Sequence, residues 1–202
     1  MTIASTDPMQ PFRIQIPDAD LEDLRNRLRR TRWPEAATAA GWTQGVPLDY
    51  LRELCAYWAR DYDWRATEAR LNAVPQFRAE LDGLRIHFLH VRSPEPAATP
   101  LVMTHGWPGS VVEFLDVIGS LADPAAHGGD RADAFDVVCP APPGYGFSDK
   151  PTATGWGVQR IARAWCELMS QLGYERFGAQ GSDWGTSIST SIGQQAPERV
   201  IG

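Results

Sequence analysis

Three short apolar segments in the second half of the chain constrain its fold most, because each is followed by a Gly- or Pro-rich turn and then by a helical stretch. The segments are PLVMT at 100–104, FDVVCP at 135–140 and RFGAQ at 176–180. The helical stretches run from Ser110 to about Leu121, from about Trp156 to Leu172, and onward from Asp183. Strand and helix alternate, which predicts an α/β fold with a mostly parallel sheet and helices on both of its faces.

Residues 18–75 show instead the three- and four-residue spacing of amphipathic helices. Asp18 is a helix N-cap by residue type, Leu21, Leu24 and Leu28 form an apolar stripe, and Pro34 ends the pattern. A second stripe follows at Leu48, Leu51, Cys55 and Trp58, and a third short helix begins at Asp63 and stops before Pro75. We therefore expect a helical N-terminal extension over residues 1–75. Its tryptophans are expected to pack in a core: Trp33, Trp42, Trp58 and Trp64.

A change of period marks the end of this extension. From Phe77 to Leu81, and again from Leu84 to Phe88, apolar and polar residues alternate, as they do in a half-buried strand. Asp82-Gly83 between the two runs is a two-residue hairpin signal. The sequence therefore predicts an antiparallel hairpin that opens the second part of the chain, residues 76–202.

The charge balance excludes some partners. The chain carries 19 lysines and arginines against 25 aspartates and glutamates, a net charge of −6, which argues against nucleic acid or an anionic membrane surface. It has no run of the roughly 18 apolar residues that a membrane span needs. The start, MTIASTDPMQPF, lacks the basic and apolar regions of a leader. We therefore expect a soluble protein without a membrane anchor.

The cysteines indicate a reducing compartment. Cys55, Cys139 and Cys166 are odd in number, widely separated and without metal-ligand spacing. They are expected to be reduced thiols in packing positions of a cytoplasmic protein, with no metal site.

The turn GSDWG has the sharpest chemical signal. A nucleophile elbow places its central residue on a strained strand-to-helix turn, with small residues two positions before and after it. Centred on Ser182, the flanking residues would be the bulky Gln180 and Trp184; centred on Asp183, they are Gly181 and Gly185. The pattern therefore predicts a carboxylate nucleophile, Asp183. The alternative is an ordinary Asp N-cap in a Gly-rich turn.

The turn HGWPGS follows the segment PLVMT. It resembles the loop that supplies one oxyanion-hole N–H in α/β-hydrolases, where the residue after the nucleophile supplies the other. The two donors would be the backbones of Trp107 and Trp184. His105 is expected to organise this loop, and Gly106 and Pro108 to shape it. Ser110 and Glu113 also have the spacing of a capping box that opens the next helix.

The turn PPGYGFS follows FDVVCP. Its glycines and prolines fix a tight backbone path, and it lacks both GxGxxG and a P-loop lysine, which argues against phosphate binding. We therefore assign it to the architecture of the site, through Gly144, Tyr145 and Gly146, with Tyr145 or Phe147 lining a pocket.

Together, HGWPGS, PPGYGFS and GSDWG, preceded by the helical extension and its hairpin, resemble the microsomal-type epoxide hydrolase family of the α/β-hydrolase fold. The second part of the chain would then be the N-terminal part of the hydrolase core. The resemblance implies that Asp183 attacks an epoxide to form an alkyl ester. Water then cleaves this ester to a vicinal diol while the N–H groups of Trp107 and Trp184 hold the oxyanion. The substrate would be a small apolar epoxide, bound in a pocket lined by Trp107, Phe147 and Trp184. No metal or organic cofactor is implied.

The sequence departs from the family's order of catalytic residues, which is nucleophile, acid, histidine. All four histidines precede Asp183, and 19 residues follow it: the histidines are His87, His90, His105 and His127. The ending ERVIG resembles the approach to another core strand. We therefore expect the N-terminal portion of a longer hydrolase, without the catalytic histidine, the acid and the two cap tyrosines. Such a chain should not turn over by itself and would need a complementing C-terminal segment.

Two other readings stay open. A haloalkane dehalogenase also uses an aspartate nucleophile, often followed by Trp, and Trp184 would then bind halide. Against it, those enzymes commonly present Asn or another polar group at the position of Trp107 and lack the long helical extension. The other reading is a non-catalytic, degenerate hydrolase fragment, which the missing histidine supports and the intact spacing of Gly181, Asp183 and Gly185 opposes.

Overall fold

The computed structural model describes residues 9–202, so the expectation for the first eight residues lies outside it. The chain divides into two compact units. Residues Ile14–Arg70 form one, here called the helical unit. The described residues before Ile14, together with Leu71–Gly202, form the other, here called the sheet unit. None of the helices within residues 9–202 has the length and apolar character needed to span a membrane.

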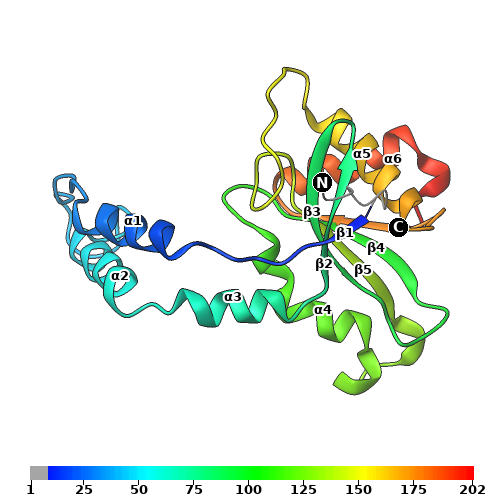
Figure 1. Ribbon diagram of the computed structural model, residues 1–202, viewed down its shortest axis with the longest axis horizontal. Helices are drawn as coiled ribbons and strands as arrows, with labels where there is room; N and C mark the ends of the chain where they lie inside the picture. The colour runs from blue at the N-terminus through cyan, green and yellow to red at the C-terminus, as the bar shows by residue number, and fades with distance from the viewer. Residues whose placement is uncertain (1–8) are drawn as a thin grey trace, which may run out of the picture. The chain divides into compact units, whose positions relative to one another are not determined.

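The sheet unit is built on six strands in the order β1-β2-β3-β5-β4-β6 (Figure 1). The strands are β1 (Met9–Pro11), β2 (Gln76–Leu81), β3 (Leu84–Val91), β4 (Thr99–Thr104), β5 (Phe135–Pro140) and β6 (Gly178–Gly181). Strands β4, β5 and β6 are parallel, whereas β1, β2 and β3 are antiparallel, and β3 joins β5 antiparallel. The predicted hairpin is β2–β3. Past the last helical turn, Val200 bridges Phe177 in parallel, so the ERVIG segment runs beside β6.

Helices cover both faces of this sheet, which confirms the predicted α/β class (Figure 1). Helices α5 (Val158–Gln171) and α6 (Trp184–Gln195) cover one face, and η1 (Val111–Phe114) with α4 (Leu115–Ala122) cover the other. Three further short 3-10 helices are η2 (Pro124–His127), η3 (Arg131–Asp133) and η4 (Pro197–Arg199). Successive strand residues alternate between the faces: Val102 and Val138 pack in the α5–α6 cluster, Met103 and Val137 in the α4 cluster.

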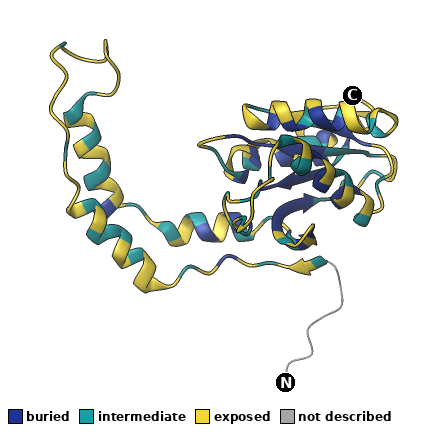
Figure 2. Ribbon diagram, turned by 90° about the horizontal axis from the view of Figure 1, so that it is seen from above, coloured by how far each residue is buried: buried dark blue, intermediate teal, exposed yellow. Residues whose placement is uncertain are grey.

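The helical unit contains α1 (Asp18–Arg29), α2 (Leu48–Arg60) and the greater part of α3 (Trp64–Asn72). Helix α1 has no buried residue and α2 buries Ala59 alone. Figure 2 shows both helices mostly in the colours of exposed and intermediate residues, whereas the central strands of the sheet are largely dark blue. The expected core packing is therefore wrong for Trp42 and Trp58, which are 60% and 44% exposed. Trp42 lies in the turn between α1 and α2, and Trp58 lies on a helix that buries a single residue.

The predicted N-cap at Asp18 and the predicted capping box at Ser110 differ from the structure. Asp18 is the first residue of α1, and Pro17 occupies the N-cap; the Asp18 carboxylate instead accepts a hydrogen bond from Arg65. Ser110 does act as an N-cap, but its hydroxyl accepts from Val112 N at 3.3 Å rather than from the Glu113 N–H. The helix begins as a tight 3-10 turn, so the capping box expected from an α-helical start does not form in that way.

Candidate active site

The three Gly- and Pro-rich turns all leave the carboxyl ends of the parallel strands, which is where α/β sheets place their sites. HGWPGS follows β4, PPGYGFS follows β5 and GSDWG follows β6. Strand β4 lies between β5 and β6. The HGWPGS turn therefore starts beside both of the others.

Asp183 has the backbone conformation of an elbow. It lies between β6 and α6 with φ 50° and ψ −119°, a left-handed conformation that a non-glycine residue seldom adopts. Its flanking glycines are required by close approach. A Cβ on Gly181 would overlap the backbone of Gly185, and a Cβ on Gly185 would overlap the carbonyl of Thr104. This crowding is the physical basis for centring the pattern on Asp183.

Backbone N–H groups surround the Asp183 carboxylate. The N–H of Trp107 donates to Asp183 Oδ1 at 2.9 Å. The N–H of Trp184, followed by that of Trp107, holds the pKa of the Asp183 carboxyl below its usual value. A Cβ on Gly106 would overlap the Asp183 side chain, so only glycine lets the loop come this close. The exposed carboxylate is therefore ionised at neutral pH, with one oxygen already hydrogen-bonded.

The indole side chains beside this carboxylate are open to solvent. Trp107 is 69% exposed and Trp184 is 55% exposed. The peptide bond between Trp107 and Pro108 is cis, and Gly109 N donates to Gly106 O at 2.8 Å, which closes the loop on itself. The structure thus places the Trp107 and Trp184 backbones near Asp183 and leaves both indoles available for an apolar ligand.

His105 is bonded within its own loop. Its ring is fully buried, its Nδ1–H donates to Gly106 O at 3.0 Å, and its edge packs against Tyr145 with ring centroids 5.5 Å apart. Burial lowers the pKa of His105, so the ring is neutral at neutral pH. This placement agrees with a residue that organises the loop, and Tyr145 joins that loop to the PPGYGFS turn.

The PPGYGFS turn is supported from the antiparallel side of the sheet. Gly144 and Gly146 take positive φ values, 86° and 50°. The Phe147 ring lies 5.4 Å from His87 and 5.5 Å from Phe12, measured between ring centroids. These contacts anchor Phe147 against β3 and the segment after β1. The substrate-lining role of Phe147 stays a prediction.

Two supporting residues, Thr104 and Arg78, are not singled out by the sequence patterns. The Arg78 Nη2–H donates to Phe147 O at 2.6 Å across 69 residues of sequence, and nothing local predicts that pairing. Thr104 carries a weak signal, because it is a hydroxyl residue that ends an apolar strand immediately before the HGWPGS turn.

The histidines have partners elsewhere or lie apart. His87 Nε2 lies 2.9 Å from Gln76 Oε1 and His90 Nε2 lies 3.0 Å from the Tyr174 hydroxyl. His105 bonds to Gly106, as above, and His127 ends η2. Within residues 9–202, no group of three or more His, Cys, Asp or Glu side chains is arranged to hold a metal ion.

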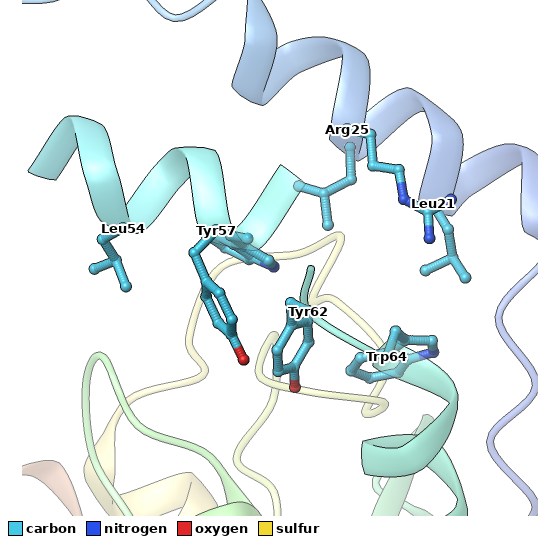
Figure 3. Close-up of a pocket in the computed structure, with 8 residues that line it drawn as sticks. Leu21, Arg25, Leu54, Tyr57, Tyr62 and Trp64 are labelled. Carbon is cyan, nitrogen blue, oxygen red and sulfur yellow. The ribbon is translucent and has the colours of Figure 1, made fainter. Parts of the chain in front are cut away.

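A separate apolar pocket lies within the helical unit. It has a volume of about 420 Å³, and Figure 3 shows the Tyr57, Tyr62 and Trp64 rings succeeding one another along it. Its lining residues are Leu21, Leu24, Arg25, Leu54, Tyr57, Trp58, Tyr62 and Trp64. The lining contains no carboxylate and no imidazole, so the candidate nucleophile is Asp183 in the sheet unit.

Comparison with known proteins agrees with this geometry. A family model described as "Epoxide hydrolase N terminus" matches residues 9–114, and one described as "alpha/beta hydrolase fold" matches residues 99–201. A protein of Stigmatella aurantiaca whose name places it among the epoxide hydrolases is 54% identical over 192 residues, covering 95% of this chain and 44% of that protein. Epoxide hydrolase 1 of Oryctolagus cuniculus is 37% identical, with 96% and 44% covered.

A solved structure shares the fold. The crystal structure of juvenile hormone epoxide hydrolase from the silkworm Bombyx mori superposes with a TM-score of 0.84 at 30% identity, covering 96% of this chain and 46% of that one. The chain thus spans less than half the length of the relatives it matches. The matches to the extension and to the core together show that the chain belongs to the epoxide hydrolase family of the α/β-hydrolase fold.

Proposed function

We propose that this protein hydrolyses a small apolar epoxide to a vicinal diol through a covalent ester on Asp183. The observation that carries the proposal is the Asp183 carboxylate on its elbow, with the Trp107 N–H 2.9 Å from Oδ1. Membership of the epoxide hydrolase family supports the choice of substrate class. The exposed indoles of Trp107 and Trp184 support an apolar substrate.

In the first step, Oδ2 of Asp183 attacks an epoxide carbon and the carbon–oxygen bond of the ring breaks. The electron pair of that bond goes to the epoxide oxygen, which takes a proton from solvent water and becomes a hydroxyl, leaving hydroxide in the solvent. Oδ1 stays with the Trp107 N–H and becomes the carbonyl oxygen of the ester. The existing hydrogen bond thereby selects which carboxylate oxygen attacks.

In the second step, water attacks Cγ of Asp183. The negative charge that develops on Oδ1 is stabilised by the N–H groups of Trp107 and Trp184, the same groups that lower the pKa of the free carboxyl. The ester bond to the alkyl oxygen breaks, the diol leaves and the carboxylate is restored. A serine in this place would form an ether, which offers water no carbonyl to attack.

This second step needs a base that removes a proton from the water. Three of the four histidines, His87, His90 and His105, are hydrogen-bonded to Gln76, Tyr174 and Gly106. The fourth, His127, ends η2 and belongs to none of the three turns. We therefore propose that a polypeptide limited to these 202 residues forms the ester but does not hydrolyse it, so that the adduct accumulates.

The intact mass of the protein after incubation with styrene oxide tests the proposal. We expect the mass of one epoxide to be added, with peptide mapping to Asp183, and no adduct in Asp183→Asn. The matched control is Asp82→Asn, because Asp82 is also an aspartate with positive φ but lies in the hairpin turn; its adduct should equal that of the parent. Because the pKa of Asp183 is lowered, the alkylation rate should stay constant from about pH 8 to about pH 5.

A folded protein that forms no adduct, or one on other residues alone, contradicts the proposal. Incubation with 1-chlorohexane, followed by measurement of intact mass and of released halide, distinguishes the dehalogenase alternative. Halide release from 1-chlorohexane, with no adduct from the epoxide, would favour that alternative. The match of the extension to the epoxide hydrolase family opposes it.

We also propose a cytoplasmic location. Cys55, Cys139 and Cys166 are free thiols, and Cys139 is buried, where its pKa is raised by the loss of solvation. Buried unpaired thiols are typical of a reducing compartment. Fractionation of source cells, with detection of the protein, tests this assignment.

A further inference from the structure

Thr104 occupies the junction between the two loops that meet at Asp183. It is the last residue of β4 and is fully buried, three positions before Trp107. Across the parallel ladder it is paired with Gly181, the last residue of β6 before the elbow. The chain therefore runs from Thr104 into the HGWPGS turn, and from its paired neighbour into the nucleophile turn.

The carbonyl group of Thr104 contacts the elbow on both sides of Asp183. Its oxygen accepts a hydrogen bond from Ser182 N at 3.1 Å. The same oxygen faces Gly185, where a Cβ would overlap it. Ser182 and Gly185, on either side of Asp183, thus contact the same carbonyl group. The separation between Asp183 and the Trp107 N–H depends on where this carbonyl lies.

The side chain of Thr104 is fixed by a residue of another element. The indole Nε1–H of Trp165, on α5, donates to Thr104 Oγ1 at 3.0 Å, and both side chains are fully buried. A buried donor or acceptor that loses its partner is destabilising, because it can no longer bond to water, so the two side chains are strongly coupled. Thr104 is also β-branched, which restricts its χ1 angle. Helix α5 thereby holds the end of β4 in one position.

We propose that Thr104, held by Trp165, is a positioning residue that sets the distance between the HGWPGS turn and Asp183. The inference rests on the proposed function, because positioning matters for the attack by Asp183. A displacement of about 1 Å in a reacting group can lower a rate by about 100-fold. The hydrogen bond between Trp165 and Thr104 is therefore expected to affect the reaction, because Thr104 is three positions before Trp107 and its carbonyl binds the residue before Asp183.

The test compares three variants. Thr104→Val keeps the β-branched shape and loses the acceptor, Thr104→Ser keeps the hydroxyl, and Trp165→Phe removes the donor. The control is Tyr174→Phe, which removes a hydroxyl that donates to Asp136 at 2.9 Å at the amino end of β5, whereas the candidate site lies at the carboxyl ends of the strands. For each protein we measure the melting temperature, the rate of Asp183 alkylation by styrene oxide, and the pKa of Asp183 by ¹³C NMR titration.

We expect Thr104→Val and Trp165→Phe to slow alkylation at least about 10-fold and to raise the pKa of Asp183 toward its ordinary value, because the N–H donors move away from the carboxylate. Thr104→Ser should stay within about twofold of the parent. Tyr174→Phe should lower the melting temperature and change neither the rate nor the pKa. This combination would show that the effect depends on the hydroxyl of Thr104 and not on general loss of stability.

The proposal is wrong if Thr104→Val and Trp165→Phe leave both the rate and the pKa unchanged, or if Tyr174→Phe shifts them equally. Should Thr104→Val fail to fold, Trp165→Phe decides alone, since it leaves the threonine in place. A parent protein that folds and is not alkylated contradicts the proposed function. In that case the pKa comparison still decides whether Thr104 positions the carboxylate.

Discussion

The elbow shows how single residues control the geometry of the candidate site. Gly185 has no side chain because the carbonyl of Thr104 occupies the space where a Cβ would lie. The obstacle is backbone, so it cannot be relieved by the rotation of a flexible side chain. Any larger residue at position 185 must move helix α6 away from β4, and Asp183, at the start of that helix, moves with it.

We therefore predict that Gly185→Ala lowers the free energy of unfolding by about 1–3 kcal/mol, as overpacking does, and strongly slows alkylation of Asp183. Gly193→Ala in the same helix is the matched control, because a Cβ there meets no atom within 4 Å. Urea unfolding followed by circular dichroism gives the stability, and intact mass gives the rate. Equal stability and equal alkylation rate in the two variants would show that the contact between Gly185 and Thr104 does not control the position of Asp183.

At this scale the sequence predicts the identity of the candidate nucleophile but not its surroundings. The glycines at 181 and 185 are local signals, and the structure shows the crowding that they relieve. Thr104 and Trp165 are 61 residues apart in sequence, and their hydrogen bond exists because two elements meet in the fold. No local pattern could predict that contact.

At the scale of elements, the β2–β3 hairpin is a case in which local chemistry determines the structure. Both central residues of its turn have positive φ, 49° at Asp82 and 82° at Gly83, as a type I′ turn requires. Asp82 also accepts a hydrogen bond from Arg160 Nε at 2.6 Å, which links the turn to α5. The side chains of this ion pair remain substantially exposed.

We predict that Gly83→Ala lowers the free energy of unfolding by about 1 kcal/mol, because alanine in the left-handed region is strained. Asp82→Asn should lower it by less than Gly83→Ala does, since asparagine tolerates the left-handed conformation and an exposed ion pair contributes little. Chemical denaturation of both variants checks the order. A larger loss in Asp82→Asn would mean that the link to Arg160, and not the backbone, stabilises the hairpin.

The sequence does not predict the burial or the exact conformation of an element when these depend on the elements packed against it. The apolar stripes of α1 and α2 show which helix face is apolar, but not what covers it, so the expected burial of Trp58 is wrong. The start at Ser110 has the spacing of an α-helical capping box, yet the chain forms a 3-10 turn there. Alternation predicts the hairpin strands β2 and β3, and short apolar segments followed by turns predict β4, β5 and β6, all of which the structure contains.

At the scale of the whole molecule, the buried His87 links the antiparallel strands to the PPGYGFS turn. It also makes the stability of the protein depend on pH. His87 is fully buried on β3, with its backbone N–H donating to Ser148 Oγ at 3.0 Å. The Gln76 amide donates to Leu71 O, so its oxygen accepts from His87 Nε2–H. His87 Nδ1 has no partner among the described residues. A proton added there would place a charge in a buried site without an acceptor.

Burial, and then the nearby Arg78 charge, lower the pKa of His87 to about 4 from an ordinary value of 6.5. Between these values the unfolded chain binds a proton that the native protein does not bind. The stabilisation is therefore fully present above the ordinary pKa and is lost as the pH falls toward the folded pKa. For this one group the loss is about 2 kcal/mol between pH 7 and pH 5.

Urea unfolding at pH 7 and pH 5 therefore should show a smaller loss of stability in His87→Gln than in the parent, by about 2 kcal/mol. The difference between the two pH values is the measurement, so any constant cost of the substitution cancels. His90, whose pKa burial also lowers to about 4, is retained in the variant and leaves part of the pH dependence. His127→Gln, at an exposed position, is the control for the loss of a histidine elsewhere in the chain. An unchanged dependence in His87→Gln would contradict this prediction, because it would mean that the native protein binds a proton at His87 as readily as the unfolded chain does.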